Sequence, residues 1–103
     1  MSRGPDAATL LDRALTTSAA RAGLELAVTT AESTRWASAT FTGARHVLEV
    51  AIGGDAAAAW LAELPEAELP MRGHLVADLA VVRQARSGAR IVATIEALTV
   101  EER

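Results

Sequence analysis

Residues 36–52 read WASATFTGARHVLEVAI, and their alternation of apolar and polar side chains decides the predicted fold. A two-residue loop at Gly43 and Ala44 suits a tight hairpin turn that needs a positive φ at its first central position. In that register Phe41 lies beside His46 on the more apolar face. The other members of this face are Ala37, Ala39, Leu48, Val50 and Ile52. The opposite face receives Trp36, Ser38, Thr40, Val47, Glu49 and Ala51. We therefore predict a β-hairpin with one buried face.

Upstream of this hairpin, the sequence predicts a helix over residues 6–21, where apolar residues recur at spacings of three and four. Asp6 is placed to cap its start, and Gly23 is placed to end it. Residues 24–30 then alternate between apolar and polar side chains. This alternation predicts a half-buried strand before the hairpin.

Downstream, Gly53 and Gly54 end the hairpin, and Asp55 is a suitable N-cap for a second helix. The apolar stripe of that helix consists of Ala57, Trp60, Leu61 and Leu64. Pro65 is expected to end the helix, because proline disrupts a helix interior. Residues 65–70 then form an acidic connector between two prolines.

The segment 71–102 predicts a second hairpin with a three-residue loop at residues 86–88, where Gly88 takes the left-handed conformation. One face of this hairpin is then apolar throughout. Its members are Leu75, Ala77, Leu79, Val81, Ile91, Ala93, Ile95 and Ala97. A two-residue loop at Ser87 and Gly88 would shift the register by one residue and mix apolar with charged side chains on one face. We therefore prefer the three-residue loop.

Together these elements predict an α+β fold in the order α-β-β-β-α-β-β. Its five-stranded, mainly antiparallel sheet is built from hairpins, and both helices pack on one face. A chain of 103 residues supports one modest hydrophobic core. We therefore expect a single domain over residues 6–103, preceded by a flexible N-terminus at residues 1–5.

Composition narrows the classes of function. The net charge of −3 argues against binding to nucleic acids or anionic membranes, and the only contrary sign is a basic hairpin tip with Arg83, Arg86 and Arg90. Cysteine is absent, which excludes disulfides and thiolate chemistry. No apolar run approaches 18 residues and the first residues lack a signal-peptide pattern, so a cytoplasmic protein is expected.

The candidate chemistry of the chain is sparse. Its two histidines lie on separate hairpins and have no metal-ligand spacing, so we expect neither a metal nor a cofactor. His46 is predicted to cap the core beside an aromatic ring rather than to catalyse a reaction. No catalytic residues are predicted.

The second sheet face carries more apolar side chains than a face in water should carry. The interface candidates on it are Trp36, Val47, Val76, Val82, Val92 and Leu98. Two short helices can cover one side of such a sheet, so the cover on this side must come from another molecule. A second copy of the chain is the simplest partner, since most soluble oligomers are symmetric homo-oligomers, and another protein is the alternative partner. The sequence therefore predicts a non-enzymatic interaction or accessory module that forms a homodimer.

An alternative is a small-molecule binding protein or minor enzyme with a site on that face, around Arg72, His74, Asp78 and Glu96. In the preferred register Asp78 lies directly opposite Glu96. Such a pair of carboxylates can hold a proton or a cation that a lone carboxylate would not. The simpler interpretation is that these are charged residues on the wet part of a partly buried face.

Overall fold

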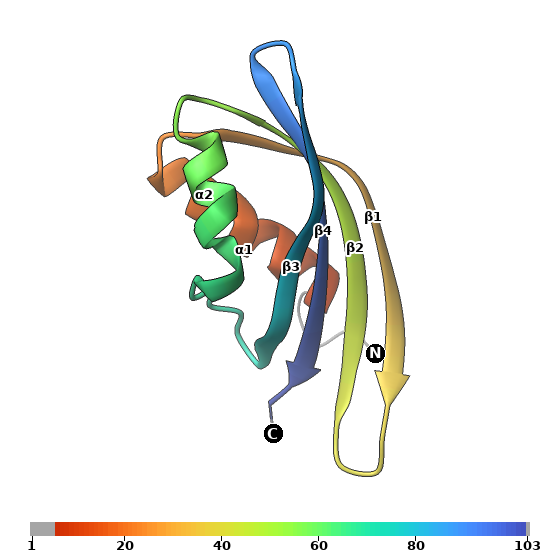
Figure 1. The fold of residues 1–103 in the computed structure, drawn as a ribbon. Coiled ribbons are helices and arrows are strands. Elements are labelled where there is room, and N and C mark those ends of the chain that lie inside the picture. The colour runs from red at the N-terminus through yellow and green to blue at the C-terminus, as the bar shows by residue number, and fades with distance from the viewer. Residues whose placement is uncertain (1–5, 103) are drawn as a thin grey trace.

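The computed structural model describes residues 6–102, so the predicted flexible segment 1–5 lies outside the described residues (Figure 1). Its elements in chain order are α1 (Ala7–Arg21), β1 (Glu25–Ala37), β2 (Thr42–Gly53), α2 (Ala57–Glu63), the short 3-10 helix η1 (Leu64–Glu66), β3 (His74–Ser87) and β4 (Arg90–Glu101). Across the described range, four strands form an antiparallel sheet in the order β1-β2-β4-β3. The α+β class with two helices is confirmed. The prediction of five strands is wrong, and the order is α-β-β-α-β-β.

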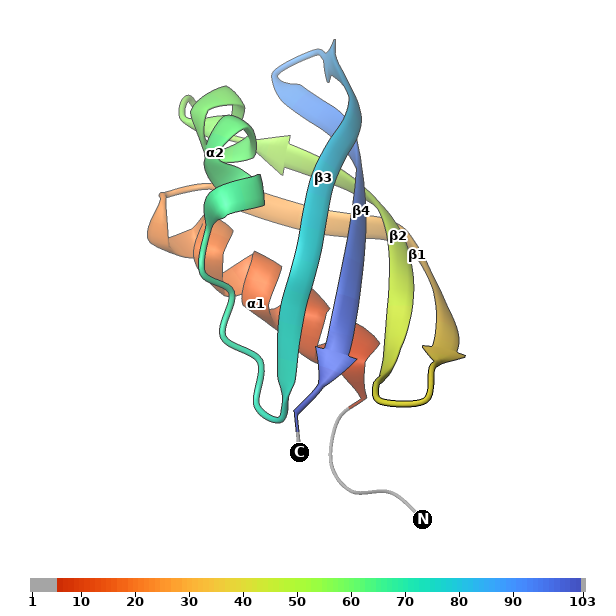
Figure 2. The same ribbon diagram turned by 60° about the horizontal axis from the view of Figure 1, so that its bottom comes forward.

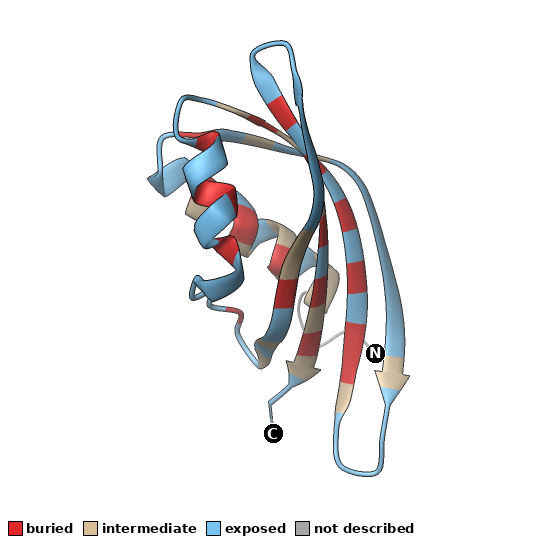
Figure 3. Cartoon of the chain, viewed as in Figure 1, coloured by how far each residue is buried: buried red, intermediate tan, exposed pale blue. Residues whose placement is uncertain are grey.

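Both helices lie on the same side of the sheet, inside its curvature (Figures 1 and 2). Buried side chains alternate along β2 and β4, as the red bands of Figure 3 show. The helical side of the core includes Leu11 and Leu15 of α1 and Leu61 of α2, each exposed by 1% or less. Trp60 of α2 donates a hydrogen bond from its indole Nε1 to Ser18 Oγ of α1 at 3.0 Å, so the two helices are joined to each other as well as to the sheet.

The ends of α1 confirm the sequence prediction. The carboxylate of Asp6 accepts a hydrogen bond from the backbone N–H of Thr9 at 2.9 Å, and this bond lowers the pKa of Asp6. At the other end Gly23 has a φ of +77°. The backbone N–H of Leu24 donates to the carbonyl of Ala19 at 2.9 Å, which is the bond expected after a glycine that ends a helix.

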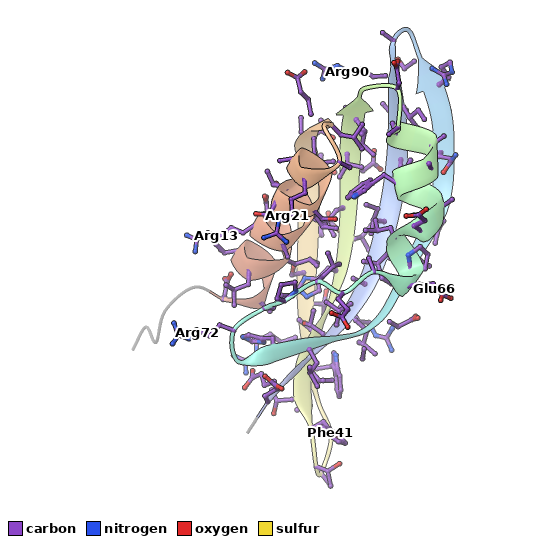
Figure 4. The ribbon with its side chains drawn as sticks, turned by 90° about the vertical axis from the view of Figure 1, so that its left-hand side faces the viewer. Arg13, Arg21, Phe41, Glu66, Arg72 and Arg90 are labelled. Carbon is purple, nitrogen blue, oxygen red and sulfur yellow. The ribbon has the colours of Figure 1, made fainter. Side chains whose placement is uncertain are left out.

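The first hairpin differs from the prediction in the position of its turn. β1 is one strand that includes both the strand predicted at residues 24–30 and the beginning of the predicted hairpin, with a register shift between Val28 and Thr30. Ala37 pairs with Thr42. The turn is therefore at residues 38–41. Ser38 stabilises it by accepting a hydrogen bond from the backbone N–H of Phe41 at 3.1 Å. Phe41 lies at the tip of the hairpin and is 54% exposed, so its predicted place in the core is wrong (Figure 4).

The second hairpin has a two-residue loop at Gly88 and Ala89, with Ser87 paired to Arg90. Gly88 has a φ of +64°, which suits the first central position of such a turn. The predicted three-residue loop is therefore wrong. The inward face of β4 is confirmed, because Ile91, Ala93, Ile95 and Ala97 are all buried.

β3 contains two β-bulges, between Val76 and Asp78 and between Val81 and Arg83. Each bulge adds a residue and reverses which side chains face the core. Leu79 remains buried as predicted, whereas Leu75 pairs with Val100 on the opposite face and is 53% exposed. The prediction that Leu75 and Ala77 belong to the core face is wrong for this reason.

The second helix keeps its predicted apolar stripe but not its predicted start. Ala57, Trp60, Leu61 and Leu64 are all buried. The N-cap is Ala56 without a side-chain hydrogen bond, so Asp55 does not cap the helix. Pro65 lies within η1, which continues the helical path for one further turn. In the part of the chain that the structure describes, no helix is long and apolar enough to cross a membrane.

Candidate functional site

The sheet has one face toward the helices and a second face, which we call the outer face, directed away from them (Figures 1 and 2). No helix among residues 6–102 lies over the outer face. Its two central strands, β2 and β4, place Val47 and Val92 on it, and these side chains are 40% and 42% exposed. Leu75 adds a third exposed apolar side chain from β3. The outer face is therefore a sheet surface that no helix among the described residues covers.

The interface candidates from the sequence divide between the two faces. Four of them lie on the outer face, because the register places them between the core-facing positions of their strands: Trp36, Val47, Val92 and Leu98. Val76 instead packs against the core. Val82 falls in the second bulge of β3 without a ladder partner and is 49% exposed.

Trp36 is half-buried because its indole lies across Gly43, its partner in β2. A Cβ atom at Gly43 would lie 2.8 Å from Cζ2 of this ring and would overlap the carbonyl oxygen of Thr99. Gly43 does not have a positive φ. This glycine is thus required for a close approach between strands, not for the turn that the sequence predicted there.

The four candidate binding residues do not converge on one point. Asp78 and Glu96 share the outer face, but Asp78 pairs with Leu98 and Glu96 pairs with Ala80, so the two carboxylates are diagonal neighbours rather than directly opposite. His74 precedes the first bulge and shares a face with core-facing Val76. Its Nδ1 atom is buried without a hydrogen-bond partner.

Arg72 is exposed in the turn that leads into β3, away from Arg90 near the other end of the sheet (Figure 4). It therefore lies outside the outer face proper. Of the predicted binding set, the structure brings together Asp78 and Glu96 alone.

A buried polar network centres on His46, which is 2% exposed. Its Nδ1 atom lies 2.7 Å from Ser33 Oγ, and its Nε2 atom lies 2.9 Å from Thr99 Oγ1. The Thr99 hydroxyl donates in turn to the carbonyl of Ala44 at 3.5 Å. These contacts are mutually consistent for a neutral imidazole with its proton on Nε2. Its Nδ1 atom then accepts a hydrogen bond from the Ser33 hydroxyl, and its Nε2–H donates one to Thr99 Oγ1. Both ring nitrogens thus have a hydrogen-bond partner, Nε2 in buried Thr99 and Nδ1 in exposed Ser33.

This network explains how a polar ring is buried at the end of the core, since an unpaired buried polar group would be costly. The predicted neighbour of His46 is Phe41, whereas its partner across the ladder is Ser33, which the sequence pattern did not indicate. The pair could be found only from the correct register of β1 against β2. That register depends on the turn at residues 38–41, whereas the Gly43–Ala44 dipeptide favoured a turn at a different position.

The stability of the protein is expected to fall as the pH drops below about 6.5, the usual pKa of histidine. Burial lowers the pKa of His46, an effect that the charge of Asp6 partly opposes and the proximity of His74 reinforces. The unfolded chain therefore binds a proton at a pH where the folded protein does not, and protonation favours unfolding. Urea denaturation at pH 7.5 and pH 5.5 would measure the loss. A His46→Gln variant with the same pH dependence as the wild type would contradict this assignment.

No group of three or more His, Asp or Glu side chains suited to a metal ion occurs within residues 6–102. Comparisons of the chain with protein-family models, with curated proteins and with solved structures yield no match.

Proposed function

We propose that this protein is a non-enzymatic interaction module that assembles as a homodimer through its outer face. The main observation behind the proposal is that the helices cover only one side of the sheet. Both helices lie on that side, but the sheet has apolar side chains on both sides (Figure 2). Val47, Leu75 and Val92 are each at least 40% exposed on the uncovered side. Large contiguous apolar patches mark sites of association, and these three side chains are the apolar part of a face that also carries Arg45, Glu49 and Glu96.

The size of the face fits a stable dimer. The whole molecule measures 45 × 24 × 23 Å, so a side bounded by its two longest dimensions is of the same order as the roughly 800 Å² that each partner buries in a standard-size interface. Two antiparallel sheets can pack face to face at about 10 Å, with their side chains interleaved. A second copy supplies such a sheet without any further partner.

The small-molecule alternative has less support. It requires His74 and the carboxylates of Asp78 and Glu96 to line one site, but His74 lies on the helix side of the sheet. The two carboxylates also lack the direct opposition that would favour a shared proton or cation.

Val47→Asp is expected to shift the protein from dimer to monomer, because it would bury a charge in the middle of the proposed interface. We expect at least a roughly hundredfold weaker dimer, in line with the cost of an unpaired charge at an interface. Sedimentation of the variant beside Ala58→Asp provides a matched comparison, since Ala58 is exposed on α2 at the other side of the sheet. A Val47→Asp protein that dimerises as tightly as Ala58→Asp would contradict the proposal.

A further inference from the structure

Four charged side chains lie at the corners of a rectangle on the outer face. Arg45 of β2 and Asp78 of β3 form one row, on either side of Leu98. Glu49 of β2 and Arg83 of β3 form a second row. Each row has one positive and one negative side chain, and the order of the signs is reversed between the rows.

The second bulge of β3 creates this arrangement. Asp78 and Arg83 are five residues apart, a spacing that places side chains on opposite faces of a regular strand. The register shift between Val81 and Arg83 returns Arg83 to the outer face, where it pairs with Thr94. Arg83 thereby lies in the same row as Glu49, which also pairs with Thr94.

A middle row separates the two charged rows, and it contains Val47, Glu96 and Ala80. Consider a two-fold axis that runs along this row, perpendicular to the strands. Rotation about it brings Arg45 and Asp78 of one copy onto Glu49 and Arg83 of the other copy. Each arginine would then face a carboxylate. An axis parallel to the strands along β4 would instead bring Arg45 onto Asp78 of the second copy and Glu49 onto Arg83 of the second copy. Only the axis across the strands brings Arg45 onto Glu49, so exchanging the charges of these two residues distinguishes the two axes.

We propose that the two copies pack about an axis along the Val47–Glu96 row, so that Arg45 pairs with Glu49 of the second copy and Asp78 pairs with Arg83 of the second copy. This inference rests on the proposed function and specifies the geometry of that dimer. A hollow of about 210 Å³ lies beside Glu49 and Arg83, in the row onto which Arg45 and Asp78 of the second copy would be brought. Arginine suits such pairs because its planar guanidinium matches a carboxylate.

The same geometry has a cost at the axis. Glu96 would face Glu96 of the second copy, and Glu32, which pairs with Val47 in the same row, would face Glu32 of the second copy. Like charges at close range repel. Glu96→Gln is therefore expected to tighten the dimer, whereas Asp78→Asn is expected to weaken it. The opposite signs of these two effects distinguish the proposed axis from a general dependence on negative charge.

The decisive experiment uses the charge reversals Arg45→Glu and Glu49→Arg, first separately and then mixed in equal amounts. Each variant alone would place like charges together twice in its homodimer, and we expect roughly tenfold or greater weakening. In the mixture, a chain with two glutamates meets a chain with two arginines, so a heterodimer of normal affinity should form. Arg45 and Glu49 are about 13 Å apart along one strand, so no new pair within a chain explains the recovery.

Sedimentation equilibrium measures the dimer affinity of the wild type, of the two variants and of their mixture. Arg13→Glu, on the exposed side of α1, is the control (Figure 4). Circular dichroism confirms that each variant is folded. The proposed axis would be wrong if the wild type dimerises and neither charge reversal weakens the dimer. It would also be wrong if the weakened variants fail to form a heterodimer on mixing. Either result would still be compatible with a homodimer through the outer face. A wild-type protein that is monomeric at every concentration would overturn both the axis and the homodimer.

Discussion

Gly43→Ala is expected to destabilise the protein by about 3 kcal/mol, because overpacking against a rigid backbone cannot be relieved by a side-chain rotation. The added methyl group would overlap the carbonyl oxygen of Thr99 and would lie 2.8 Å from the Trp36 ring. The ladder between β2 and β4 must shift to accept it. Since Thr99 also binds His46, the shift would disturb the buried polar network.

Gly53→Ala is the matched control, because Gly53 lies at the end of the same strand. A Cβ atom there would lie 3.8 Å from its nearest neighbour, the flexible side chain of Arg90. We expect a change within about 0.5 kcal/mol, typical of a surface substitution. Urea denaturation of the two variants tests the account, and equal losses of stability would contradict it.

Leu15→Ala is expected to cost about 2–5 kcal/mol, the range for removing a fully buried leucine side chain and leaving a cavity. Leu15 is 0% exposed and belongs to the core cluster between α1 and the sheet. The neighbouring Leu10 is only partly buried on the same helix. Leu10→Ala should therefore cost clearly less.

Thermal and urea unfolding of both alanine variants would measure this difference. If Leu10→Ala destabilised the protein as much as Leu15→Ala, the face of α1 that packs on the sheet would be assigned incorrectly.

The parts of the fold that local rules govern could be predicted from the sequence. The cap at Asp6 and the helix end at Gly23 depend on residues next to them in the chain, and both are present. The inward side of β4 follows from simple alternation, because this strand pairs on both sides without a bulge of its own. The stripe of α2 likewise depends on spacing alone.

The errors arose where a residue serves a distant contact or where a strand changes its period. Gly43 resembles a turn glycine in the sequence. In the structure it is needed because the Trp36 ring and the Thr99 carbonyl oxygen lie too close for a Cβ atom. The bulges in β3 have no local sequence signature, yet they decide that Leu75 faces outward and that Asp78 does not oppose Glu96. For the same reason the charged rectangle on the outer face could not be predicted before the register was known.

The central claim is that a second copy of the chain covers the outer face, and the absolute mass of the wild-type protein in solution tests it most directly. Light scattering on a sizing column, across a micromolar dilution series, should give nearly twice the chain mass of 10.7 kDa at the higher concentrations. The mass should fall toward 10.7 kDa on dilution. A mass of 10.7 kDa at every concentration would contradict the account.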